Sequence, residues 1–215
     1  MKNTTKLLAG SLFLLAMLAT ALPAHATPIV EYLLTSDHCT GGCGTAPFGI
    51  VTLEQNGLNL DITVHLYNDN LFVKTGAADF KNFKFNGVGI VLGDITVDQT
   101  VPTHTLVASA GAFNGDGTGE FGFAIACSTC GNGAGAGNAF AEDIVFHIAN
   151  ASIADVTVPN NLGNVFVADI YSQETGNTGP VDATTPREVP EPNSLLLLGV
   201  AVSGLGLLSR ARMKR

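Results

Sequence analysis

The chain has 215 residues, with 10 basic and 18 acidic side chains and a formal net charge of −8 at pH 7. Between Thr27 and Glu188 we count 17 acidic and 4 basic residues, so this body carries 4 − 17 = −13. Such an acidic body repels phosphate backbones, which argues against nucleic-acid binding. The charge is compatible with binding of cations or neutral glycans, or with a role in solubility alone. Its roughly 160 residues suffice for one domain with its own core.

The N-terminus has the layout of a secretory signal peptide, which we expect to span residues 1–26. Lys2 and Lys6 form a short basic start, and an almost wholly apolar run follows. Ala24 and Ala26 place small residues at the two positions that a signal peptidase reads, so we expect cleavage after Ala26. An uncleaved membrane anchor is the alternative.

Residues 27–174 have the pattern of an all-β domain. Asn56-Gly57, a strong hairpin signal, separates two strand-like runs, and apolar and polar residues alternate from Leu58 to Tyr67. Further strand candidates are Ile29–Leu34, Lys81–Phe85, Val88–Val97, Thr105–Ala110, Glu120–Ala126, Glu142–Ile148 and Val165–Tyr171. Many short strands separated by turn residues predict an antiparallel, jelly-roll-like β-sandwich, with a barrel as the less favoured alternative. We find no run of helical periodicity in this body and no internal repeat.

The four cysteines form two close pairs, Cys39 with Cys43 and Cys127 with Cys130. An exported protein meets an oxidising compartment, so we expect disulfides. Two pairs allow three connectivities, and the sequence leaves the choice open, although glycines inside the first pair favour local closure. A zinc site built from the thiolates is the alternative.

A weak calcium candidate lies in the stretch "NGDGTGE". Its alternating oxygen-bearing residues are Asn114, Asp116, Thr118 and Glu120. Oxygen ligands on a flexible loop suit Ca²⁺, but surface turns have the same composition and the spacing is not that of an EF-hand. The sequence contains no G-x-S-x-G, H-E-x-x-H or phosphate-loop motif. We therefore expect no cofactor and no enzymatic activity.

The C-terminal end divides into a predicted linker at residues 175–188 and a tail at residues 189–215. The tail opens with Val189, Pro190, Glu191 and Pro192, continues with the apolar run Leu195–Leu208, and ends with Arg210, Arg212, Lys214 and Arg215. As a helix the run would reach ~21 Å, which is short for a hydrocarbon core of ~30 Å. A temporary membrane helix with its basic end at the cytoplasmic face fits best. A lasting tail anchor and a helix packed on the domain are the alternatives, and the basic end disfavours the second.

This order of motif, apolar run and basic end, behind a signal peptide, resembles the PEP-CTERM sorting signal of exported bacterial proteins. The resemblance implies recognition by an exosortase, a membrane enzyme thought to cleave the tail. Such proteins occur in Gram-negative bacteria that make extracellular polysaccharide, and many are linked to biofilm or floc matrix. Asn193 and the short apolar run depart from the usual pattern. The body is similar to Gly- and Asn-rich β proteins that often carry this tail, and no activity carries over from them.

The sequence thus predicts an exported protein that is anchored transiently in the inner membrane and then reaches the cell surface or extracellular matrix. There it would be a structural or polysaccharide-associated protein. Its expected partners are a signal peptidase, an exosortase-type enzyme and extracellular polysaccharide, and not nucleic acid. Two alternatives stay open: a secreted enzyme that acts on matrix glycans with carboxylates from separate strands, and a metal-binding module that uses the cysteine pairs.

Overall fold

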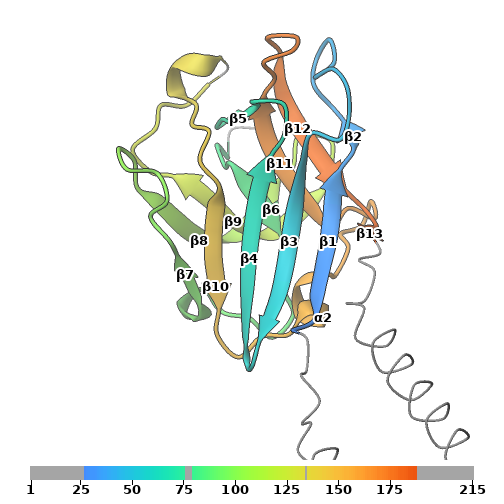
Figure 1. Cartoon of the computed structure of the whole chain (residues 1–215), viewed down its shortest axis with the longest axis vertical. Coiled ribbons are helices and arrows are strands. Elements are labelled where there is room, and N and C mark those ends of the chain that lie inside the picture. The colour runs from blue at the N-terminus through green and yellow to red at the C-terminus, as the bar shows by residue number, and fades with distance from the viewer. Residues whose placement is uncertain (1–26, 76–78, 134, 188–215) are drawn as a thin grey trace, which may run out of the picture.

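A computed structural model describes residues 27–75, 79–133 and 135–187 of the chain, which form a sandwich of two antiparallel sheets (Figure 1). The predicted signal helix, the cleavage residues Ala24 and Ala26, and the C-terminal apolar helix lie outside the described residues. The expectation of an all-β sandwich is confirmed. None of the helices in the described part of the chain is long and apolar enough to cross a membrane.

The first sheet, sheet A, has six strands. In spatial order they are β13 (Pro186–Arg187), β1 (Ile29–Leu34), β3 (Gly49–Asn56), β4 (Asn59–Leu66), β10 (Ile144–Ile148) and β7 (Ile95–Val97). The strands β3 and β4 form the predicted hairpin, with Asn56 opposite Asn59 across a two-residue turn. Gly57 has a φ of 64° there, a conformation that favours glycine. Leu58, where the predicted alternation begins, is 77% exposed because it belongs to the turn.

The second sheet, sheet B, has seven strands. Its order is β2 (Ser36–Asp37), β12 (Thr178–Ala183), β11 (Phe166–Tyr171), β6 (Phe83–Phe85), β9 (Glu120–Cys127) and β8 (Leu106–Asn114), and β5 (Leu71–Phe72) pairs with β11 beside β6. Spatial neighbours such as β4 and β10, or β11 and β6, are far apart in the sequence. The chain therefore changes sheets repeatedly, as it does in jelly-roll sandwiches.

Two predictions of local structure are wrong. The linker expected at residues 175–188 contains β12, whose residues 179–183 are buried, and β13, which pairs with β1. The composition of this segment does not show that it is buried, because part of the burial comes from close backbone packing. Gly179 packs directly on Cys39, and a Cβ at position 179 would lie 2.7 Å from the Cys39 Cα. Of the strand expected at Val88–Val97, only Ile95–Val97 is extended.

The start of that expected strand forms a turn and the 3₁₀ helix η1 (Leu92–Asp94) instead. The Asp94 carboxylate accepts the backbone N–H of Val91 at 2.9 Å, and this hydrogen bond stabilises the turn against an extended chain. Among the described residues, the other short helices are η2 (Ala136–Asn138) and α2 (Ile153–Val156). Neither was predicted, because a single turn is too short to show helical periodicity.

The core between the sheets is rich in phenylalanine. Phe83 and Phe85 of β6 are fully buried, and their rings lie 6.1 Å and 5.2 Å from that of Phe146 on β10 in the opposite sheet. Phe83 also stacks on Phe166 of β11 at 5.9 Å. Since strand residues alternate between faces, the inward direction of Phe83 and Phe85 sends Lys84 to the outer face of sheet B.

The Phe83–Phe85 pair gives a test of the core. We expect Phe85→Ala to lower the free energy of unfolding by about 3–5 kcal/mol, because it removes a buried ring and leaves a cavity. Leu58→Ala is the matched control, since Leu58 is 77% exposed and its loss should change stability by less than about 0.5 kcal/mol. Urea unfolding with the disulfides intact measures both. Equal effects of the two variants would contradict this assignment of the core.

Candidate functional site

The cysteines form two local disulfides, Cys39–Cys43 and Cys127–Cys130, and none of the four is free. The expectation of disulfides is confirmed. The first closes the loop after β2, where the Asp37 carboxylate accepts the N–H groups of Cys39 at 2.9 Å and Cys43 at 2.7 Å. This hydrogen bonding fixes the loop geometry that brings the two sulfur atoms together.

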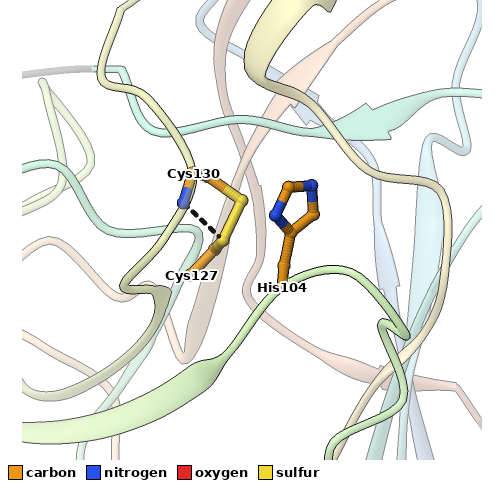
Figure 2. A group of neighbouring side chains, drawn as sticks. All are labelled: His104, Cys127 and Cys130. Atoms are coloured by element: carbon orange, nitrogen blue, oxygen red, sulfur yellow. Dashed lines mark hydrogen bonds between the residues drawn. A yellow bond between two sulfur atoms is a disulfide. The ribbon is translucent and has the colours of Figure 1, made fainter.

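The second disulfide follows the end of β9, with the ring of His104 beside it (Figure 2). Asn82 accepts the Cys127 N–H at 2.8 Å, and the Lys74 Nζ donates to the Cys127 carbonyl at 2.6 Å. The two cysteine pairs belong to separate side-chain groups, one with His104 and one with Asp37. The sulfurs therefore do not form the four-thiolate zinc site that the sequence left open.

The calcium candidate forms the turn between β8 and β9. Asn114 Oδ1 accepts the N–H of Asp116 at 2.9 Å, and the buried hydroxyl of Thr118 donates to the Gly115 carbonyl at 2.7 Å. Two of the four candidate side-chain oxygens, those of Asn114 and Thr118, thus make hydrogen bonds within the turn. This is the behaviour of a surface turn, and calcium binding by Asn114, Asp116, Thr118 and Glu120 stays a prediction.

The outer face of sheet A carries a group of charged side chains that we call the histidine–aspartate band. It consists of Asp61, His65, Asp98, Asp143 and His147. His147 on β10 lies directly opposite Asp61 on β4, and its Nδ1 is 2.7 Å from Asp61 Oδ1. Its Nε2 is 3.0 Å from Asp98 Oδ2, just beyond β7. His147 therefore joins three neighbouring strands across the face of the sheet.

A second pair extends the band along the same two strands. The Nδ1 atom of His65 lies 2.7 Å from Asp143 Oδ1, and the His65 ring meets the Tyr67 ring edge-on with 5.5 Å between centroids. The side chains of His65, Asp98, Asp143 and His147 are between 39% and 50% exposed. The band is thus open to solvent and offers carboxylate oxygens and imidazole rings to a ligand.

The hydrogen bond with Asp61, together with the contact with Asp98, raises the pKa of His147 above 6.5, and partial burial opposes this only in part. A protonated imidazole can donate from both nitrogens at once, which matches its two carboxylate partners. The sequence alone does not reveal a partner for His147. Asp61 is 86 positions away in the chain, so only the strand pairing reveals the contact.

The comparison with known families concerns the other end of the chain. Residues 188–214 match the PEP-CTERM protein-sorting motif. The chain carries a PEP-CTERM sorting motif. The resemblance noted for the tail is thereby confirmed, and the motif supports an exported protein with a membrane-associated C-terminal sorting signal that an exosortase processes.

The PEP-CTERM motif includes the predicted sorting residues Val189, Pro190, Glu191 and Pro192 and the basic residues Arg210, Arg212 and Lys214, while Arg215 follows its last matched position. All eight lie outside the described residues. No curated protein and no solved structure matches the chain.

One surface hollow of about 250 Å³ lies on sheet B. It is lined by Asn86, Gly111, Ala112, Glu120, Phe121 and Gly122. Glu120 is its single carboxylate. Glycosidases of the common type use two carboxyl groups on either side of the bond that they cleave. The hollow as described does not supply such a pair.

The histidine–aspartate band predicts a specific pH dependence. Because the folded pKa of His147 lies above its unfolded value of 6.5, the stabilisation is complete below pH 6.5 and is lost as the pH rises through the folded pKa. We expect Asp61→Asn to lower the titration midpoint of His147, followed by NMR of the imidazole resonances, and to weaken this pH dependence of unfolding. Asp69→Asn, an exposed turn substitution, is the control. An unchanged His147 midpoint in Asp61→Asn would refute the pairing.

Proposed function

We propose that this exported β-sandwich is a non-enzymatic protein of the cell surface or extracellular matrix that binds neutral polysaccharide through the outer face of sheet A. The observation that carries the proposal is the open histidine–aspartate band. The sorting motif supports the destination, because it marks an exported chain. Release by a signal peptidase and transient anchoring in the inner membrane complete the proposed route.

The chemistry of the band suits sugar hydroxyls. Carboxylates accept hydrogen bonds from O–H donors, and such charge-assisted bonds are stronger than neutral ones. The rings of His65 and Tyr67 add apolar surface beside Asp143. The net charge of −13 for the body, from 4 basic and 17 acidic residues between Thr27 and Glu188, opposes the approach of a polyanion and so favours a neutral glycan.

A secreted enzyme acting on matrix glycans is the second candidate. In the band, Asp61 and Asp98 both contact the same histidine, so each carboxylate already has a hydrogen-bond partner and neither is a free acid or base. The hollow on sheet B offers Glu120 alone as a carboxylate. Both observations support binding over hydrolysis, and the binding experiment below includes a readout for turnover.

The proposed binding is tested with the protein and the extracellular polysaccharide of the same producing strain. We expect co-sedimentation of the two, and we expect the double variant Asp61→Asn/Asp143→Asn to bind about tenfold or more weakly, because two charged acceptors are lost. Asp69→Asn is the matched control. Equal binding by the double variant would remove the band from the proposal. Release of new reducing ends during incubation would favour the enzyme instead.

The proposed destination is tested in the producing organism. We expect the full chain to appear at the surface or in the matrix as a species whose mass lacks the tail. A chain that ends at Glu188 should be exported but should stay out of that fraction, because the motif begins there. Asn193→Ser, which introduces a small residue after the Pro-Glu-Pro triplet, is the control and should sort normally. A full-length species that keeps Arg215 in the membrane fraction would contradict transient anchoring.

A further inference from the structure

Sheet B buries a lysine on its outer face. Lys84 lies between Phe83 and Phe85 on β6, and its side chain has no exposed surface. Asp169 on the neighbouring strand β11 is equally buried. Val167 is the residue opposite Lys84, so Asp169, two positions along, shares its face of the sheet. The Lys84 Nζ lies 3.0 Å from Asp169 Oδ2.

A second carboxyl group faces the same lysine. Asp79 Oδ1 is 3.9 Å from the Lys84 Nζ, and the Asp79 side chain is 13% exposed. Among the described residues, neither oxygen of Asp79 has a hydrogen-bond partner of good geometry, and Asp169 Oδ1 has none either. Buried polar atoms normally find partners, so this cluster of one amine and two under-satisfied carboxyl groups needs an explanation.

The surroundings favour uncharged forms of the two acids. Burial raises the pKa of Asp169 to about 7, although the charge of Lys84 opposes the shift. Burial likewise raises the pKa of Asp79, again against the opposing effect of Lys84. A buried ion pair gains little over an uncharged arrangement, because removing both charges from water costs as much as their attraction returns. An amide between the two side chains would remove both charges.

We propose that Lys84 and Asp169 are the partners of an intramolecular isopeptide bond, and that Asp79 carries the proton that its formation requires. The reaction is a condensation: the Lys84 ammonium and the Asp169 carboxylate give one amide and one water. After proton transfer within the pair, the neutral Nζ attacks the Asp169 Cγ. The protonated Asp79 gives its proton to the departing hydroxyl and takes a proton from the nitrogen through its other oxygen, which restores its starting form. Charge and atoms balance, and no external reactant is consumed.

Three features of the site fit this step. The side chains are held together by strand pairing, which makes the reaction effectively unimolecular. The burial of both partners excludes the water that would reverse it. Asp79 lies beside the Lys84 amine, with 3.9 Å between Oδ1 and Nζ. A small movement, or one bridging water, would allow proton transfer between them. The site therefore contains a nucleophile, an electrophile and a proton carrier on one face of one sheet.

The bond would supply a link that the two disulfides do not. Each disulfide joins cysteines four or three positions apart. Lys84 and Asp169 are 85 positions apart and lie on the adjacent strands β6 and β11 of sheet B. Closing a longer loop restricts the unfolded chain more, so this amide would stabilise the domain more than either short disulfide does. Unlike a disulfide, the amide would not be broken by a reductant.

The test is mass spectrometry of the full chain produced in an exporting host and isolated as folded protein. After reduction of the disulfides, we expect a mass lower by one water than the mass calculated for the chain between its observed termini. Protease digestion should yield a branched peptide that joins the segments around Lys84 and Asp169. Lys84→Met should restore the full mass. Recovery of the linear Lys84 peptide from folded wild-type protein, with no branched species, would overturn the proposal.

Two further variants keep the test decisive if Lys84→Met does not fold. Asp79→Asn retains Lys84 and Asp169, and we expect it to fold and to lose most of the branched peptide. A branched peptide at the wild-type level in this variant would show that Asp79 takes no part in the reaction. Asp69→Asn is the matched control for Asp79→Asn, because Asp69 lies in an exposed turn; it should keep the link. Dehydration at Asp116-Gly117 would also lower the mass by one water, but it would give no branched peptide and would persist in Lys84→Met, against the proposal.

Discussion

The packing of β6 against β10 is the contact on which the rest of the sandwich depends. Phe83 and Phe85 meet Phe146 of the opposite sheet, and this aromatic cluster joins the two layers at their centre. The strand β6 has only three residues, and the first and last of them, Phe83 and Phe85, point into the core. The middle residue, Lys84, must therefore point to the outer face of sheet B. The aromatic core therefore fixes where the buried amine lies and which residue of β11 can reach it.

The two outer faces of the sandwich consequently differ in character. On sheet B the outer face is sealed around Lys84 and Asp169, and residues beside them such as Val167 and Ala124 are also fully buried. On sheet A the corresponding face carries exposed, paired charges at His65 and His147. We interpret sheet B as the face that holds the domain together and sheet A as the face available for contacts with other molecules.

Patterns local to one strand or one turn could be predicted from the sequence. The alternation of apolar and polar residues beside Asn56-Gly57 predicted the β3–β4 hairpin, and the strand Ile29–Leu34 was predicted with its observed bounds. The strand β12 was missed because its polar, Gly- and Pro-containing sequence is buried through pairing with β11 rather than through its own apolar side chains. The partners of Lys84 and His147 could not be predicted, because they depend on which distant strands become neighbours.

The topology also relates the sorting tail to the proposed binding face. β13 pairs with β1 at one edge of sheet A, with Arg187 opposite Glu31, so the described domain begins and ends at the same edge. The PEP-CTERM motif starts at residue 188, immediately after β13. The histidine–aspartate band lies on β4, on β10 and beside β7, toward the opposite edge of the sheet. A domain held by its tail would thus be attached at one edge while the band at the other edge stays accessible, which is the arrangement that a protein needs if it is to bind a ligand while still on the membrane.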